Sequence, residues 1–280
     1  MIEFEKFLRF PQGKQKAFTL SYDDGVVADK TLIQYLNKHN VRCTFNLNSG
    51  LFDTRGNHNS MTEQECYDTF STAGQEIALH GHRHLFLTKV PVPQGIAEML
   101  QNRQYLEKKY NRIVDGMAYA FGAFDEHIKN YLSLCGVKYA RTTNSTSTFE
   151  LPKDFLEWNP TCHHNDKNLM LLAQKFVEGN PSCEYKHRES MLFYVWGHSY
   201  EFDDNNNWDV LDGLLQTICG RDDVWYATNG EICNYITAYN SLVWAVDDVC
   251  VYNPSALDVW FERNKRLYCV PSGQTIAINK

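Results

Sequence analysis

The sequence predicts an α/β fold of parallel strands and helices, followed by a small antiparallel β appendage. Seven short apolar or aromatic runs precede residue 240, at residues 17–22, 43–47, 75–79, 114–120, 138–141, 191–196 and 224–227. Helix-patterned sequence, or a loop leading to it, follows each run, and this alternation favours parallel strands joined by helical crossovers. After residue 240, closely spaced strand-like runs alternate with turn sequences, which is typical of antiparallel strands. We therefore expect a barrel-type domain over residues 1–240 and an appendage over residues 241–280.

The individual helices are supported by spacing and by end signals. Residues 28–39 place Leu32, Ile33 and Leu36 on one face, as an amphipathic helix requires. Thr62 precedes Glu65 at the spacing of a capping box, and Thr228 and Glu231 repeat the pattern. Asp125 is placed to cap the helix that ends near Gly136.

Composition excludes some classes of partner. The 280 residues carry a formal net charge of -7 with a pI near 5.8. Nucleic acids and anionic membranes need a basic surface, so we expect neither as a partner. The nine cysteines show no C-x-x-C spacing, which favours reduced thiols over a disulfide framework. No signal peptide is readable at the start, so we expect a cytoplasmic protein, or an extracellular one if a leader was removed. Composition leaves the oligomeric state open.

Two adjacent carboxylates leave the first predicted strand. Asp23 and Asp24 lie in the sequence S-Y-D-D-G, at the carboxyl end of that strand. In parallel α/β folds ligands gather at this edge, and neighbouring carboxylates point in different directions, so one can bind a cation while the other acts as a base. A simple turn explains the same residues, because Asp and Gly suit turn geometry.

Histidines occupy the corresponding position after the third strand. His80 ends the strand and His84 follows one helical turn later, so both imidazoles can reach one metal if the residues between them start a helix. His82 is an alternative partner, and a solvated turn is the alternative to a metal site. Two histidines and one carboxylate suit zinc first, with Co, Mn, Fe or Ni as alternatives.

A further histidine, His198, ends the sixth predicted strand. From there it can reach the metal centre across the barrel, and a side chain with a pKa near neutrality suits protonation of a leaving group. A lone histidine is otherwise a packed or surface residue.

Four ordered motifs now carry a family resemblance. They are S-Y-D-D-G at residues 21–25, E-I-A-L-H-G-H-R-H-L at 76–85, Y-A-F-G-A-F-D at 119–125 and Y-V-W-G-H-S-Y-E at 194–201. Over about residues 16 to 238 the chain resembles the polysaccharide deacetylase family, also called the NodB-homology family or carbohydrate esterase family four. The resemblance implies a distorted (β/α)7 barrel, in agreement with the strand count.

The resemblance also implies roles for individual residues. Asp23 corresponds to the catalytic base, and His198 to the general acid. Asp24, His80 and His84 correspond to the metal ligands. The backbone N–H of Phe121 corresponds to an oxyanion donor.

Three positions depart from the family pattern. Ala118 stands where an arginine usually holds the base, and we expect Arg141 either to replace it or to form a surface salt bridge. Gly81 replaces the usual Ser or Thr after the first histidine. Gly197 replaces the usual leucine before the last one.

Substrate contacts are expected from aromatic residues on or near the predicted rim, namely Tyr22, Tyr119, Phe121, Trp158, Trp196 and Trp208. Such faces stack on sugar rings, although most aromatic residues belong to the core. The long polar loop 142–168 contains the sequence C-H-H-N-D at residues 162–166, which could line the site, bind a second metal or be solvated.

These expectations combine into a hypothesis of metal-dependent hydrolysis of an N- or O-acetyl group on a carbohydrate, with an aspartate base, a metal-activated water and a histidine acid. Two alternatives stay open. One is a metal-dependent amidase acting on a small N-acyl or ureide metabolite. The other is a catalytically silent carbohydrate-binding protein.

Overall fold

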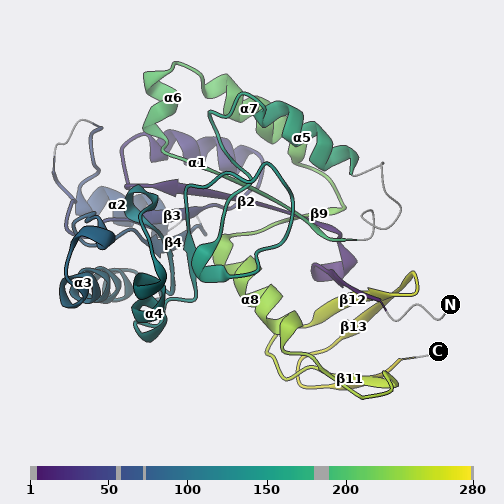
Figure 1. Ribbon diagram of the computed structural model, residues 1–280. Coiled ribbons are helices and arrows are strands. Elements are labelled where there is room, and N and C mark those ends of the chain that lie inside the picture. The colour runs from purple at the N-terminus through teal and green to yellow at the C-terminus, as the bar shows by residue number, and fades with distance from the viewer. Residues whose placement is uncertain (1–4, 55–57, 72–73, 180–188, 279–280) are drawn as a thin grey trace.

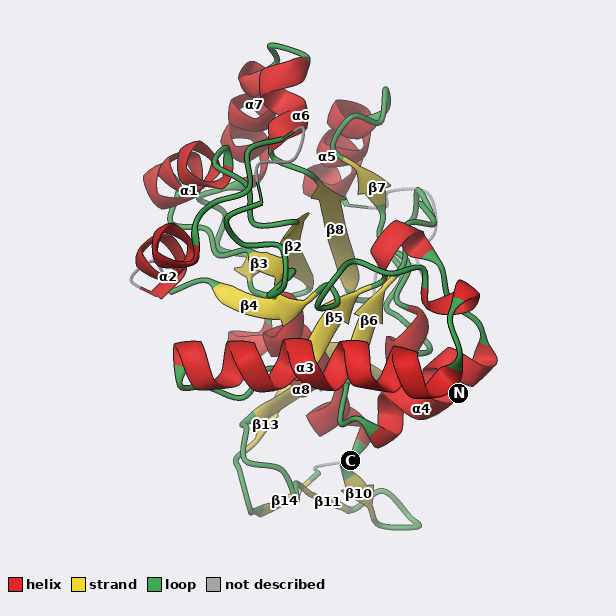
Figure 2. Cartoon of the chain, turned by 90° about the vertical axis from the view of Figure 1, so that its left-hand side faces the viewer, coloured by secondary structure: helices red, strands yellow, loops and turns green. Residues whose placement is uncertain are grey.

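The computed structural model describes residues 5–54, 58–71, 74–179 and 189–278. Its centre is a sheet of parallel strands in the order β6-β5-β4-β3-β2-β8-β7, with β9 pairing with β2 beside β3. The strands are β2 (Lys16–Asp23), β3 (Thr44–Leu47), β4 (Glu76–Leu79), β5 (Gly116–Ala118), β6 (Tyr139–Arg141), β7 (Cys162–His163), β8 (Met191–Gly197) and β9 (Val224–Tyr226). The sheet curls, as Figure 2 shows. The predicted distorted barrel is confirmed.

Segment 158–163 links the two ends of this curl. Trp158 N–H donates to the carbonyl of Ala140 and Thr142 N–H to that of Trp158, which extends the pairing beyond β6. A few residues later, β7 pairs with β8. The sequence reading missed β7 because two residues are too short to show a strand period.

Eight α-helices are found in the described residues: α1 (Asp29–Lys38), α2 (Glu63–Ser71), α3 (Val92–Tyr110), α4 (Glu126–Leu134), α5 (Leu169–Glu178), α6 (Tyr200–Asp204), α7 (Trp208–Ile218) and α8 (Asn229–Asn240). Helices α1, α5 and α7 group on one side of the molecule, and α3 and α4 on another (Figure 1). Short 3-10 turns occur at Pro11–Gly13, Leu87–Lys89, Ala120–Gly122 and Phe155–Glu157. No helix among the described residues is both long and apolar enough to cross a bilayer.

Strand β8 shows how the sheet divides the core. Phe193 and Val195 pack in the larger apolar cluster with residues of α1 and α7. Leu192, Tyr194 and Trp196 alternate with them and pack in a second cluster with residues of α8. Such alternation follows from the two-residue period of a strand, and burial on both faces explains why β8 reads as a continuous apolar run.

The expected helix signals operate in the structure. Leu32, Ile33 and Leu36 are buried on α1. Thr62 and Glu65 exchange reciprocal hydrogen bonds of 2.9 and 3.1 Å before α2. The capping box at Thr228 starts α8.

The appendage consists of two small antiparallel sheets. Strands β10 (Val243–Trp244), β11 (Cys250–Tyr252) and β14 (Thr275–Ala277) form one, in the order β10-β11-β14. The other has the order β1-β12-β13, with β12 (Val259–Arg263) and β13 (Arg266–Val270) joined by β1 (Lys6–Arg9) from the start of the chain. Both lie beside α8 in Figure 1. An isolated N-terminal strand carries no signal of its distant partner, so the sequence did not place β1 here.

Candidate active site

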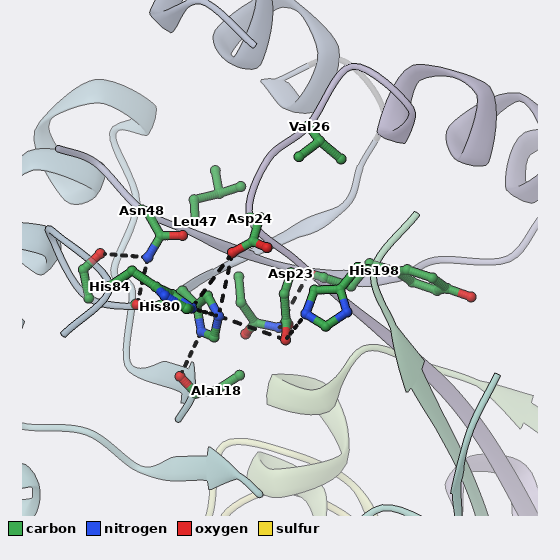
Figure 3. Close-up of polar contacts among 12 residues, drawn as sticks. Asp23, Asp24, Val26, Leu47, Asn48, His80, His84, Ala118 and His198 are labelled. Atoms are coloured by element: carbon green, nitrogen blue, oxygen red, sulfur yellow. Dashed lines mark hydrogen bonds and ion pairs between the residues drawn. The ribbon is translucent and has the colours of Figure 1, made fainter. Parts of the chain in front are cut away.

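The predicted site residues meet at the carboxyl edge of the central sheet. Asp23 is the last residue of β2, His80 follows β4, and His198 follows β8. Figure 3 shows Asp24, His80 and His84 facing one another, with Asp23 between this group and His198. Parallel strands bring their carboxyl ends to one edge, which is why residues far apart in sequence converge.

Asp24, His80 and His84 form a candidate metal centre, with one donor atom from each residue and all three atoms within 4.8 Å of one another. The Nε2 atoms of His80 and His84 lie 3.1 Å apart. Oδ1 of Asp24 lies 3.7 Å from the first nitrogen and 3.8 Å from the second. Two nitrogens each about 2.1 Å from one zinc ion stand roughly 3.0–3.4 Å apart, so the spacing suits a shared cation.

The tautomer of His80 also suits a metal ligand. Its Nδ1 lies 2.9 Å from the backbone carbonyl of Ala118, and His80 is only 2% exposed. A carbonyl only accepts hydrogen bonds, so Nδ1 carries the proton and the lone pair of Nε2 faces Asp24. Burial and the neighbouring His80 lower the pKa of His84, which favours the neutral ring that coordinates metals. The residues present therefore fit a divalent cation.

The loop between the two histidines is not a helical turn, which corrects the expectation from their spacing. His84 has φ 57° and Asp24 has φ 81°, both left-handed conformations that are uncommon without glycine. Gly81 has φ 85°, and a Cβ added there would stand 2.9 Å from Oε1 of Glu98. The same oxygen accepts a hydrogen bond from the backbone N–H of Arg83. Gly81 thus replaces the usual residue because this loop needs both its backbone freedom and its lack of a side chain.

His82 is not part of the cluster. Its Nδ1 lies 3.0 Å from the hydroxyl of Ser49, away from the donor atoms of the metal group. The alternative in which His82 replaces a ligand therefore has no support in the geometry.

Asp23 is held in the ionised form by its neighbours. Arg141 donates a hydrogen bond to Oδ2 of Asp23, and Asn46 Nδ2 donates to Oδ1 at 2.8 Å. Burial would raise the pKa of Asp23, but Arg141 and then His80 and His198 lower it to about 2. Arg141 is 1% exposed, so the pair is not a surface salt bridge. Arg141 therefore contacts Asp23 as a substitute for the arginine missing at Ala118 would.

His198 lies on the other side of Asp23. Its Nε2 is 3.9 Å from Oδ2 of Asp23, and its Nδ1 is 3.2 Å from Oε1 of Glu201 on α6. Burial lowers the pKa of His198, but Glu201 and Asp23 outweigh burial and raise it overall. A raised pKa keeps the ring protonated nearer neutral pH, as a proton donor requires.

Gly197 has a packing explanation. A Cβ at this position would stand 2.1 Å from Nδ1 of His164. The His164 ring occupies that space, stacked on Phe202 at a centroid distance of 4.1 Å and on Tyr22 at 5.6 Å. The departure at Gly197 is therefore matched by a histidine from the loop 142–168.

The aromatic residues expected at the rim mostly belong to the core. Tyr119 is 1% exposed and its hydroxyl donates to the carbonyl of Leu156, so the expectation of a rim position for Tyr119 is wrong. Tyr22, Trp158 and Trp196 are also buried. Sequence patterns do not separate buried tyrosines and tryptophans from those at a rim, because both kinds combine a large apolar ring with a polar atom.

Trp208 is half-buried, and Phe121 is the most exposed of the six, with 53% of its surface exposed. It has φ 59°, stacks on Phe86 at a centroid distance of 3.7 Å and lies edge-on to His84 at 4.4 Å. Its ring and backbone therefore border the metal cluster. The strained backbone conformation is typical of a functional position.

Sequence reasoning missed the residues that hold the site together. Asn102 on α3 accepts from the backbone N–H of His80 and donates to the carbonyl of Leu47 and the hydroxyl of Ser49. Asp29 accepts from the hydroxyl of Ser199 at 2.6 Å and from the N–H of Val26 at 3.1 Å, which ties the loop after Asp24 to the residue after His198. A polar residue on the buried face of a predicted helix was the only available signal for either.

Comparison with known proteins supports the family resemblance. The family model described as "Polysaccharide deacetylase" matches residues 11–140. Over these residues, which make up less than half of the chain, the sequence is similar to polysaccharide deacetylases. The match supports the predicted class of enzyme, a hydrolase of the polysaccharide deacetylase kind. No curated protein sequence is a significant match to the chain.

Solved structures share the fold at low sequence identity. A candidate polysaccharide deacetylase from Mycobacterium smegmatis is 16% identical, with a TM-score of 0.60, and the match covers 86% of this chain and 95% of that one. The chitin deacetylase of Colletotrichum lindemuthianum is 17% identical, with a TM-score of 0.52 over 81% of this chain and 90% of that one. A mutant of BA3943, a carbohydrate esterase family four pseudoenzyme with restored activity, is 14% identical, with a TM-score of 0.51 over 81% and 70%.

Another match is partial. The chain spans 62% of the Streptococcus pyogenes deacetylase PplD, and 50% of this chain is covered, at 21% identity and a TM-score of 0.46. That likeness carries no argument about activity.

Proposed function

We propose that the protein is a metal-dependent deacetylase that removes an N- or O-acetyl group from a carbohydrate. One observation carries the proposal. Oδ2 of Asp23 lies 3.8 Å from Nε2 of His80 and 3.9 Å from Nε2 of His198, so a buried, ionised carboxylate stands between a candidate metal centre and a candidate acid. The relation to polysaccharide deacetylases supports the same reaction class.

Asp24, His80 and His84 would hold the divalent cation, with zinc as the first expectation. A bound divalent cation lowers the pKa of water and polarises a carbonyl. The carboxylate of Asp24 would supply the negative charge of the ligand set, and the two imidazoles would be neutral.

Asp23 would act as the general base. Its low pKa keeps the carboxylate ionised at neutral pH, and Arg141 and Asn46 fix its orientation. Arg141 then has a second effect, because a strongly paired carboxylate is a weaker base. The position of the carboxylate beside the metal group offsets this weakness, since proton transfer is needed only from a water already made acidic.

His198 would act as the general acid, with Nε2 directed toward Asp23 and the reacting centre. Proton transfer from Nε2 would release the amine or alcohol of the sugar. The backbone N–H of Phe121 would donate to the developing oxyanion, and the exposed Phe121 ring would contact the substrate.

The proposal is tested by metal analysis of the purified protein combined with an acetate-release screen. The panel contains chitooligosaccharides, acetylated xylan, peptidoglycan fragments and small N-acyl and ureide compounds. We expect one equivalent of divalent metal per chain and acetate release from at least one acetylated glycan, lost on chelation and restored by zinc.

Other outcomes assign the alternatives. Release only from small N-acyl compounds would favour the amidase. Glycan binding without acetate release, even with added zinc, would favour a catalytically silent protein such as the natural form of the BA3943 pseudoenzyme. An absence of metal binding would reject the proposal.

A further inference from the structure

A second group of histidines and a carboxylate lies on the far side of His198. The donor atoms of His163, His198 and Glu201 all lie within 4.8 Å of one another, as in the candidate metal centre. His163 belongs to the sequence C-H-H-N-D, which the reaction proposed above leaves unused. Such a group can either bind a metal ion or keep a proton on one of its histidines.

A backbone hydrogen bond to His163 distinguishes between these two roles. The N–H of Asn165 donates to Nδ1 of His163 at 3.1 Å. Nδ1 is therefore the unprotonated nitrogen of the neutral ring, and Nε2 carries the proton. That nitrogen lies at ion-pair distance from the carboxylate, with Nε2 3.2 Å from Oε2 of Glu201. A cation on Nε2 would have to displace this proton while Nδ1 still accepted a hydrogen bond, so His163 is a donor and not a ligand.

One oxygen of Glu201 faces the loop and the other faces His198. Oε2 faces the loop, with Nε2 of His163 at 3.2 Å and Nδ2 of Asn165, which donates to it, at 3.2 Å. Oε1 faces Nδ1 of His198 at 3.2 Å. Burial would raise the pKa of Glu201, but the contacts with the histidines lower it overall, so the carboxylate is ionised. The loop thus holds one oxygen and leaves the other for His198.

The loop that supplies His163 is itself anchored to the sheet. His163 pairs with Trp196 in the ladder between β7 and β8, and its ring lies edge-on to the Trp196 indole at 4.6 Å. The N–H of His164 donates to the carbonyl of Trp196 at 2.8 Å, and the ring of His164 is 1% exposed. Nε2 of His164 is 2.8 Å from Oε2 of Glu201, so this buried ring also holds the same carboxylate oxygen. His163 therefore stands on a rigid support.

We infer that His163 is a positioning residue, which fixes Glu201 so that its free oxygen orients His198 and stabilises the protonated His198 ring. The inference rests on the proposed function for the role of His198 as an acid, but the contact chain from His163 through Glu201 to His198 is independent of any substrate. The other groups that face His198 are Asp23 and Asp24 on the β2 side and the rings of Tyr200 at 5.2 Å, Trp196 at 5.8 Å and His163 at 6.4 Å. Because the His163 and Trp196 rings stay in place in Glu201→Gln, that variant separates the route through Glu201 from direct ring contacts.

The first test is NMR of the histidine side chains in the zinc-loaded protein. We compare the wild type with His163→Ala, His163→Gln and Glu201→Gln, and we use His127→Ala on the exposed face of α4 as the matched control. The pKa of His198 should fall by roughly 0.5–1 unit in His163→Ala and further in Glu201→Gln. It should stay near the wild-type value in His163→Gln, whose amide can still donate to Oε2, and in His127→Ala. An unchanged His198 titration in His163→Ala would overturn the inference.

The second test uses the chemistry of the leaving group. An aryl acetate needs little acid assistance, whereas an acetylated amine or sugar alcohol needs a proton on departure. We expect His163→Ala to lose roughly 10- to 100-fold in kcat on the acetylated sugar, with KM little changed, and only a few-fold on 4-nitrophenyl acetate. Equal losses on both substrates would show a general structural defect and overturn the inference. Thermal unfolding identifies a misfolded variant, in which case Glu201→Gln decides the same question.

Zinc titration separates the remaining outcomes. One equivalent in both the wild type and His163→Ala is expected. A second equivalent that is lost in His163→Ala would make the group a cation site and contradict the inference. If no substrate releases acetate at any zinc concentration, the proposed function fails, and the NMR titration alone decides whether His163 sets the state of His198.

Discussion

The two histidine clusters at the sheet edge each contain two histidines and one carboxylate, yet the backbone gives their histidines different tautomers. In the metal group, the carbonyl of Ala118 accepts from Nδ1 of His80, so the lone pair of Nε2 is free. In the group of His163, His198 and Glu201, the N–H of Asn165 donates to Nδ1 of His163, so the proton is on Nε2. One backbone atom in each case thus decides whether the inward-facing nitrogen binds a cation or donates a proton.

Asp23 lies between the two clusters, so histidines of both clusters act electrostatically on its carboxylate. Its Oδ2 is at nearly equal distances from His80 and His198, and Arg141 balances its charge. Residue type alone therefore does not identify a metal site. The hydrogen bond on the outer nitrogen of each histidine must be known as well.

The largest effect expected from this contrast is in metal binding. His84→Ala removes one ligand of the metal group, so zinc affinity should fall by more than the roughly 10–100-fold that losing a supporting residue costs, and turnover should fall to background. His163→Ala, with the same change in the other cluster, should keep one equivalent of zinc. Metal analysis after dialysis measures both. Equal loss of zinc in the two variants would remove the distinction between the clusters.

The second-largest effect is expected at Asp23, which lies between the two clusters. Asp23→Asn should retain zinc but lose roughly 10²–10⁴ in kcat, because the base is gone while all three ligands remain. Paired metal analysis and steady-state kinetics measure the two properties. Turnover close to that of the wild type would exclude Asp23 as the base.

Arg141→Met tests how the buried charge is balanced. Removing one partner of a buried pair costs about 3–5 kcal/mol in the free energy of unfolding, because the other charge is left unpaired. Without Arg141 the pKa of Asp23 should rise from about 2, so the acid limb of the rate profile should move to higher pH. Arg141→Lys, which keeps a charge, should show a smaller change in both. Denaturant unfolding and the pH dependence of kcat/KM provide the measurements, and an unmoved acid limb in Arg141→Met would contradict this account.

The smallest effect is expected at Asp29, which links the two loops of the site. Burial raises the pKa of Asp29 to about 8, whereas the same group in the unfolded chain has a pKa near 3.8. Between these values the folded protein binds more protons, so its stability falls as pH rises through the folded pKa. In metal-free protein the free energy of unfolding should fall by on the order of 1–2 kcal/mol between pH 6 and pH 8. Asp29→Asn should abolish this part of its pH dependence. Identical slopes in the two proteins would show that Asp29 is ionised in the fold.

Much of the fold could be predicted from the sequence because the strands are buried and the helices carry end signals. Each of the seven predicted runs overlaps a strand, because strands that are buried on both faces read as continuous apolar runs, as residues 191–196 do. The two-residue strand β7 and the N-terminal strand β1 escaped prediction. Their pairing depends on partners that are distant in sequence, such as Phe261 opposite Leu8.

The residues of the candidate site could be predicted from the sequence, but the hydrogen bonds that connect them could not. Asp24, His80 and His84 were predicted to converge from their places after strands, and the structure brings them together, although the turn between the histidines is a left-handed loop and not a helical turn. The placement of Tyr119 failed because a periodic pattern does not tell a core aromatic residue from a rim one. Asn102 and Asp29 were missed because a polar residue on a helix gives no sign of the loop that it will hold.

The sequence by itself determined the type of sheet, the edge at which chemistry gathers and the residues available there, because strand period and chain order are local properties. Only the tertiary structure decided that Arg141 reaches Asp23 and that His164 occupies the space beside Gly197. It also decided the positions of the protons on His80 and His163. The proton on His80 depends on the carbonyl of Ala118 on another strand, and that on His163 on the conformation of its own turn at Asn165, and neither contact exists before the chain has folded.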